Sequence, residues 1–187
     1  MGKYKYLVIH CTATPFGREY TEEKIRQIFK NKGWKQVGYR ETVHFDGSVI
    51  KYIDHNHDDI VQGFEITNGA RGFNSISQHV SYIGGIDNKG VPKDTRTLSQ
   101  YLKLIEIVSE EIKRHPNIKV IGHNQLTNKK ACPSFFVPDF LDELNDKEKL
   151  KEKLISLGAE SWFVDSYTQI SPTIPEVNIL RDKSIKK

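Results

Sequence analysis

The 187-residue chain is poor in cysteine, with only two, and it has no long apolar run. Two thiols, Cys11 and Cys132, do not make a disulfide framework, although they could form a single bridge. A transmembrane helix needs about 20 consecutive apolar residues, so we expect no membrane insertion. The N-terminal residues lead directly into a β-prone run without an apolar signal region. We therefore expect a protein that is made in the cytoplasm without a signal peptide.

A strong charge of one sign is also missing. The 28 basic and 24 acidic side chains leave a net charge of +4, which suits an anionic partner such as cell wall or nucleic acid without requiring one. The basic end, residues 181–187, lacks the interleaved aromatic residues of a nucleic-acid-binding module, so we expect no nucleic-acid partner. The hydrophobic content of 37% and the chain length fit one globular domain with a tail.

β-prone and helix-prone segments alternate along the chain. We expect strands at 4–11, 42–45, 48–53, 76–83 and 118–122, and helices at 21–33, 97–114 and 135–157. Thr21 and Thr97 are good N-caps for the first two helices, and Asp46-Gly47 is a typical hairpin turn. From Trp162 onwards the pattern dissolves. This interleaving predicts an α/β single domain with a central mixed β-sheet flanked by helices, a C-terminal helix and an extended tail.

Three side chains in distant segments form a set of metal ligands. His10 and His123 each close a short β-prone run, where a sheet presents side chains to a cleft, and Cys132 lies in a later segment. Two imidazoles and one thiolate are ligands of a catalytic zinc that keeps its fourth position for water. The sequence therefore predicts a Zn²⁺ site formed by His10, His123 and Cys132. Cys11 alternates with His10 along the strand, so we expect it to be a buried small hydrophobic residue.

Two further residues are candidates for the chemistry at such a site. Bound zinc lowers the pKa of its water from about 15.7 to about 7, and attack of the resulting hydroxide on a carbonyl creates an oxyanion. Lys130, two residues before Cys132, is the candidate donor to that oxyanion. Tyr39 is the candidate that holds the water or the leaving nitrogen. Taken alone, a lysine such as Lys130 is most often a surface amine, and a tyrosine such as Tyr39 is most often a packing residue with a polar tip.

The remaining histidines carry no metal role in this interpretation. His55 and His57 lie in a solvated, Asp-rich turn, and they would need a third ligand to bind a metal by themselves. His44, His79 and His115 are expected to be ordinary strand or helix-end residues.

Several short motifs follow one another in an order that matches a known family. They are Val8-Ile9-His10-Cys11-Thr12-Ala13-Thr14, Gly33-Trp34 with Val37-Gly38-Tyr39, Phe45-Asp46-Gly47-Ser48-Val49, Gly72-Phe73-Asn74-Ser75-Ile76, Gly84-Gly85-Ile86-Asp87 and Lys130-Ala131-Cys132-Pro133-Ser134-Phe135. Together they resemble the zinc-dependent N-acetylmuramoyl-L-alanine amidases of the phage-lysozyme type, which are relatives of the peptidoglycan recognition proteins. The resemblance covers roughly residues 4–141.

This resemblance implies a zinc hydrolase that cleaves the amide between N-acetylmuramic acid and the L-alanine of the peptidoglycan stem peptide. By the same likeness, His10, His123 and Cys132 fall on the zinc ligands, Tyr39 on the tyrosine near the zinc water, and Lys130 on the lysine that steadies the oxyanion. We expect residues 1–145 to form the zinc amidase domain and 146–187 a C-terminal helical extension and tail. The expected protein is a monomer that degrades cell wall, as a phage or prophage endolysin or as a bacterial enzyme.

One departure from the family concerns a substrate contact. The family often carries a histidine in the loop before the Gly-x-Asn segment, where this chain reads Asn68-Gly69-Ala70, so that contact is missing or replaced. The alternatives to an enzyme are a non-catalytic peptidoglycan-binding module and a regulatory protein that uses the amidase surface to bind another protein. Non-cutting relatives typically lack the cysteine ligand, so Cys132 favours the enzyme.

Overall fold

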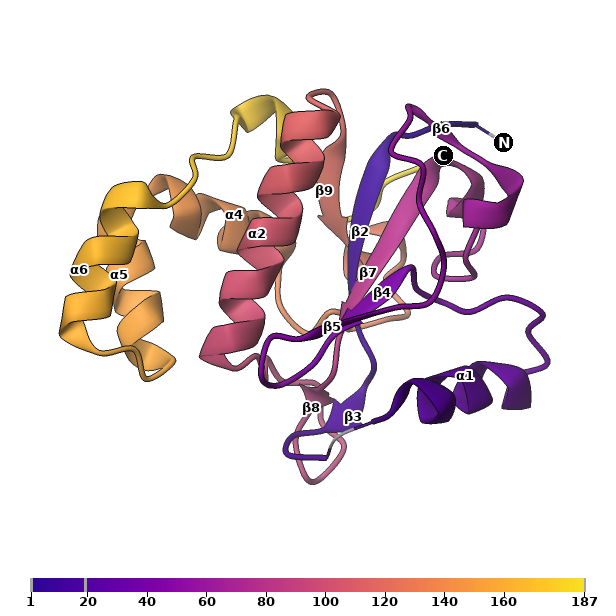
Figure 1. The fold of residues 1–187 in the computed structure, drawn as a ribbon, viewed down its shortest axis with the longest axis horizontal. Helices are drawn as coiled ribbons and strands as arrows, with labels where there is room; N and C mark the ends of the chain where they lie inside the picture. Colours follow the sequence, from indigo (N-terminus) through magenta and orange to yellow (C-terminus); the bar gives the residue numbers. More distant parts are fainter. Residues whose placement is uncertain (1, 19, 187) are drawn as a thin grey trace.

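The centre of the fold is a five-stranded β-sheet with the strand order β5-β4-β7-β2-β9 (Figure 1). The computed structural model describes residues 2–18 and 20–186. The strands of the sheet are β2 (Tyr6–Cys11), β4 (Glu41–Val43), β5 (Val49–Lys51), β7 (Ser77–Tyr82) and β9 (Lys119–Gly122). β4, β7, β2 and β9 run parallel, and β5 pairs antiparallel with β4. The predicted α/β class with a mixed sheet is therefore confirmed.

β2 lies between β7 and β9 and is buried on both of its faces. Leu7 and Ile9 belong to the main hydrophobic core, together with residues of the long helix α2. Val8 and His10 alternate with them and point to the opposite face, where they are 0% and 1% exposed. Parallel strands that are covered on both faces are usually apolar throughout. His10 is therefore a buried polar exception that needs partners.

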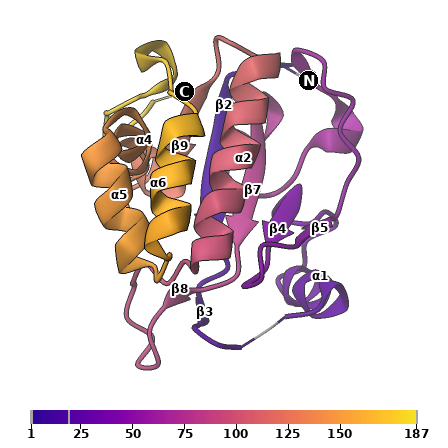
Figure 2. The ribbon, with the colours of Figure 1, turned by 60° about the vertical axis from the view of Figure 1, so that its left-hand side comes forward.

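α2 (Leu98–Arg114) covers one face of the sheet, as Figures 1 and 2 show. It begins with the predicted cap: Thr97 Oγ1 accepts from the Gln100 amide, and the Gln100 side chain accepts from the Thr97 amide. Its inward face consists of apolar side chains that are almost fully buried: Tyr101, Leu104, Ile105, Val108 and Ile112. Burial of this stripe fixes α2 against the sheet.

α1 (Glu22–Asn31) lies near the β4–β5 side of the sheet (Figure 2). Thr21 caps it by accepting a hydrogen bond from the Lys24 amide. Ile25 and Phe29 are buried in a second hydrophobic cluster, against which Tyr39 packs. The ring centroids of Phe29 and Tyr39 are 5.3 Å apart. This cluster holds Tyr39 beside the end of β2.

The C-terminal part forms three helices, α4 (Val137–Asn145), α5 (Lys147–Ser156) and α6 (Ser161–Ile170). The sequence pattern predicted one helical run to 157, but Asp146 interrupts it by capping α5 through the Glu148 and Lys149 amides. The prediction of an extended chain from Trp162 is wrong for α6. Val164 and Thr168 of α6 are buried, and the helix packs along α5 (Figure 2). The extended tail begins after α6.

This tail lies along the outer edge of β9. Ile179 is 6% exposed and forms a parallel bridge with Val120. Asn178 Nδ2 donates to the carbonyls of Pro116 and Ile118 at 2.9 and 2.7 Å. The tail therefore covers the edge of a sheet that would otherwise present unpaired backbone groups. The division into a domain of residues 1–145 and an extension of residues 146–187 stays a prediction.

The other elements are short. They are β1 (Gly2–Lys3), which pairs with β6 (Ile60–Val61); β3 (Thr14–Pro15), which pairs with β8 (Gly85–Ile86); the four-residue helix α3 (His123–Leu126); and the 3-10 turns Gly63–Glu65, Asn74–Ile76 and Glu176–Asn178. Among the described residues, no helix combines the length and the apolar character needed to cross a membrane.

Candidate metal centre

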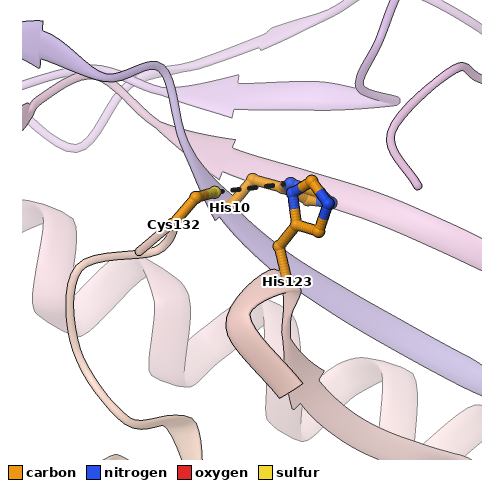
Figure 3. Close-up of side chains that lie close together, drawn as sticks. All are labelled: His10, His123 and Cys132. Atoms are coloured by element: carbon orange, nitrogen blue, oxygen red, sulfur yellow. Dashed lines mark hydrogen bonds between the residues drawn. The ribbon is translucent and has the colours of Figure 1, made fainter. Parts of the chain in front are cut away.

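The three predicted metal ligands come together beside the carboxyl ends of two neighbouring parallel strands. His10 lies near the end of β2, His123 directly follows β9, and Cys132 lies in the loop before α4 (Figure 3). One potential ligand atom from each residue lies within 4.8 Å of the others. Cys132 Sγ is 3.6 Å from His10 Nδ1, and the ring centroids of His10 and His123 are 4.7 Å apart. The structure thus groups the residues that the sequence selected.

Backbone hydrogen bonds hold the Cys132 loop against this edge. The Asn124 amide donates to the Cys132 carbonyl at 2.7 Å, which ties the loop to the segment that carries His123. Ser134 Oγ donates to the Gly85 carbonyl at 2.6 Å. The Cys11 amide donates to Cys132 Sγ at 3.2 Å, an interaction that favours the thiolate. Sequence reasoning missed this amide contact because it arises only when the loop folds back on β2.

The two cysteines have different environments. Both are free thiols, so the single disulfide that the sequence allowed does not form. Cys11 is 3% exposed and packs in the main core, which confirms its expected role as a small hydrophobic residue. Burial raises the pKa of the Cys132 thiol. A thiolate at this place therefore needs a cation beside it, and a bound metal ion supplies one.

Both candidate histidine ligands are held as neutral imidazoles. Burial lowers the pKa of His10, and the neighbouring His79 and His123 lower it further. Burial, followed by the positive charge of Lys130, lowers the pKa of His123 to about 4. A neutral imidazole has a free lone pair, and this is the form that binds a metal ion. At neutral pH the centre therefore offers two imidazole nitrogens and one sulfur.

His79 is a neighbour of the centre that sequence reasoning did not select. It lies on β7, is 0% exposed, and its Nδ1 is 3.0 Å from His10 Nε2. Its ring also lies against Gly69 of the Asn68-Gly69-Ala70 segment, where an added Cβ would come within 2.4 Å of the ring. In the sequence, the one feature that could have pointed to His79 was the presence of a histidine within a buried strand. The register between β2 and β7 was needed to place it.

Tyr39 and Lys130 lie near the centre, as expected. The Tyr39 ring centroid is 5.2 Å from that of His10, and its hydroxyl donates to the Cys11 carbonyl at 3.3 Å. Burial raises the pKa of the Tyr39 phenol, so the group stays protonated. Lys130 is exposed, and its charge lowers the pKa of both His123 and Cys132. Their catalytic roles stay predictions.

A second group of potential ligands lies beside α2, at a cavity of about 300 Å³. The sequence left His55 and His57 without a third ligand, and the structure brings a Glu111 oxygen within 4.8 Å of their ring nitrogens. Glu111 Oε1, however, accepts from Arg40 at 3.0 Å, and Oε2 accepts from the Tyr4 hydroxyl at 2.8 Å. Both oxygens of this carboxylate thus already accept hydrogen bonds from buried groups, and we assign no metal to the group.

Comparison with known proteins identifies the family. Residues 1–135 match the family model described as N-acetylmuramoyl-L-alanine amidase. The endolysin of Enterobacteria phage K11 is 33% identical over 127 residues, which are 68% of this chain and 78% of that protein. The endolysin of Klebsiella phage KP32 is 32% identical over 129 residues, 69% of this chain and 80% of that protein.

A solved structure shares the fold. It is the endolysin amidase LysCS from Clostridium intestinale, which matches with a TM-score of 0.60 and 20% identity over 77% of this chain and 85% of that chain. All the motifs that suggested the family in the sequence lie within residues 1–135, the region that matches the family model. This region also contains all five strands of the central sheet. The chain belongs to the N-acetylmuramoyl-L-alanine amidase family and is a peptidoglycan amidase.

Proposed function

We propose that the chain is a zinc-dependent hydrolase that cleaves the amide between N-acetylmuramic acid and L-alanine in peptidoglycan, with His10, His123 and Cys132 as the metal ligands. One observation carries the proposal: in a member of this family, these two imidazoles and one thiol converge within 4.8 Å at the end of β2. The relatives from phages K11 and KP32 are named endolysins. We infer that this chain acts on bacterial cell wall in the same way.

The donor set fits zinc better than other common ions. Imidazole nitrogen and thiolate sulfur are preferred by zinc, whereas magnesium and calcium prefer oxygen ligands. Three protein ligands leave one position free, which is the arrangement of catalytic rather than structural zinc sites. When bound, zinc supplies a Lewis acid and an activated water at neutral pH. The protein contributes two neutral imidazoles, a thiol held by the Cys11 amide, and a fixed geometry.

Tyr39 and Lys130 have complementary roles in this proposal. The protonated Tyr39 hydroxyl lies beside the His10 ring, and in this role it would turn from the Cys11 carbonyl to donate its hydrogen bond to the attacking water or to the leaving nitrogen. The Lys130 side chain is exposed beside the metal centre, and its positive charge lowers the pKa of His123 and of Cys132. There it donates to the oxyanion that forms when the amide carbonyl is attacked.

The proposal is tested on protein that is purified without chelator and incubated with purified peptidoglycan. We expect about one zinc per chain, as in single-metal hydrolases, and mass spectrometry should detect free stem peptides that begin with an L-alanine amine. A chelator should stop the release, and added zinc should restore it. Release by the metal-free protein would contradict the zinc dependence. Bound zinc without cleavage of this amide would contradict the reaction.

A further inference from the structure

We propose that His79 is a positioning residue for the metal ligand His10: it accepts the Nε2–H of His10 and thereby leaves His10 Nδ1 unprotonated and directed at the metal. This inference rests on the proposed metal centre. His10 Nε2 and His79 Nδ1 are 3.0 Å apart, whereas His10 Nδ1 lies 3.6 Å from Cys132 Sγ. One ring nitrogen of His10 thus faces the candidate ligands, and the other faces His79.

The register of the central sheet brings the two rings together. In the parallel pair of β2 and β7, Val8 lies opposite His79, and His10 lies opposite Ser81. His79 and His10 therefore project from the same face of the sheet, on neighbouring strands. Their ring centroids are 5.2 Å apart with an interplanar angle of 57°. Both residues are at most 1% exposed, so solvent does not compete for the contact.

The positions of the protons on the His10 and His79 rings follow from the chemistry of imidazole. A neutral imidazole has one donor nitrogen and one acceptor nitrogen, so a hydrogen bond between two rings needs a donor from one and an acceptor from the other. A His10 that binds a metal through Nδ1 carries its proton on Nε2. His79 must then accept through Nδ1, and its own proton lies on Nε2. Only this assignment satisfies the metal and the 3.0 Å contact together.

The loop around Gly69 holds the His79 ring in place. A Cβ on Gly69 would lie 2.4 Å from both Cγ and Nδ1 of His79, so the backbone passes directly against the ring. The loop itself is anchored by the Asn68 amide, which donates to the Val37 carbonyl at 2.8 Å, and by the Ala70 amide, which donates to Asn74 Oδ1 at 2.7 Å. The ring is thus held by the loop while it contacts His10.

A purely structural role does not explain a histidine at this position. His79 Nε2 is buried and has no hydrogen-bond partner among residues 2–18 and 20–186. A buried polar group without a partner is costly, and an apolar side chain would fill the same space without that cost. The contact with His10 supplies the reason for the imidazole. Partners of metal-bound histidines orient the ligand ring, and their loss commonly weakens metal binding by about 10–100-fold.

The test compares zinc affinities, measured by competition with a chromophoric chelator, in wild type, His79→Leu and His79→Gln. We expect His79→Leu to bind zinc about 10–100-fold more weakly. His79→Gln, whose amide oxygen can accept from His10, should recover part of that loss. Gln78→Leu is the matched control, because Gln78 is 1% exposed on the same strand and alternates to the face of the main core. It should bind zinc like the wild type.

Unchanged zinc affinity in a folded His79→Leu variant would overturn the role of His79 while leaving the metal centre intact. A wild-type protein that binds no zinc would instead overturn the metal centre, and with it this inference. Should the variants not fold, ¹⁵N NMR of the imidazoles in zinc-loaded wild type decides the question. We expect a proton on His10 Nε2 and none on His79 Nδ1, and a proton on His79 Nδ1 would refute the assignment.

Discussion

Two groups of potential metal ligands lie near opposite ends of β2, and they differ in what their ligand atoms already bind. Near the end of the strand, His10 Nδ1 and Cys132 Sγ face each other. Near its start, the Glu111 carboxylate is engaged by Arg40 and by the hydroxyl of Tyr4. Both groups meet the same distance limit of 4.8 Å. Proximity alone therefore does not define a metal site; the hydrogen bonds and ion pairs that the ligand atoms already make with other groups also decide.

The largest effect is expected from Cys132→Ser. A hydroxyl is a much poorer zinc ligand than a thiolate, so the variant should retain zinc much more weakly and lose nearly all amidase activity. His57→Ala, in the second group, should keep both. Zinc quantification and stem-peptide release on the two variants measure this contrast. Full activity with stoichiometric zinc in Cys132→Ser would remove Cys132 from the ligand set.

Arg40→Met should affect stability and leave zinc binding unchanged. Arg40 pairs with both Glu41 and Glu111, and all three residues are at most 5% exposed, so the variant leaves two buried carboxylates without their cation, at a cost of about 3–5 kcal/mol. Urea unfolding of the zinc-free protein measures the loss. Lys151→Met is the control, because Lys151 pairs with Glu148 at the surface and such pairs contribute at most about 1 kcal/mol. Equal losses in both variants would show that the buried pair has no special weight.

Lys130→Ala should slow turnover by about 10²–10³-fold, the usual effect of losing one oxyanion donor. Zinc content should stay the same, because the amine is not a ligand in this scheme. Lys129→Ala removes a neighbouring exposed lysine and should leave the rate unchanged. If both variants have the wild-type rate, Lys130 has no part in the reaction.

A further contrast concerns the pH dependence of stability in the zinc-free protein. The folded-state pKa is about 4 for His123 and about 3 for His79, because burial opposes their charged forms. The unfolded chain, with histidine pKa values near 6.5, binds more protons below that pH, so stability should fall as pH drops from about 6.5 toward 4. His55 in the second group has the same shift, to about 4. His79→Leu should flatten the curve, and a steeper curve would contradict this account.

Local sequence signals predicted much of this arrangement. His10 and His123 each close an apolar run, and this placement at strand ends follows from the pattern alone. Thr21 and Thr97 marked the starts of α1 and α2 because capping depends on neighbouring residues. The spacing to Cys132 suggested Lys130, and the resemblance to a known family then selected Tyr39 among the tyrosines.

Long-range contacts account for what the sequence did not reveal. His79 contacts His10 only through the pairing of β2 with β7, and no spacing along the chain encodes that register. α6 was missed because its helix is stabilised by packing on α5 rather than by a strong local pattern. The docking of the tail depends on the free edge of β9, which becomes apparent only once the strand order is known.

The most direct test of the metal centre is X-ray absorption at the zinc edge on protein loaded with one equivalent of zinc. We expect a single sulfur at about 2.3 Å and nitrogen or oxygen ligands at about 2.0–2.1 Å. The sulfur should disappear in Cys132→Ser and remain in Cys11→Ala. A wild-type spectrum without sulfur would contradict the account, because it would place the zinc away from Cys132.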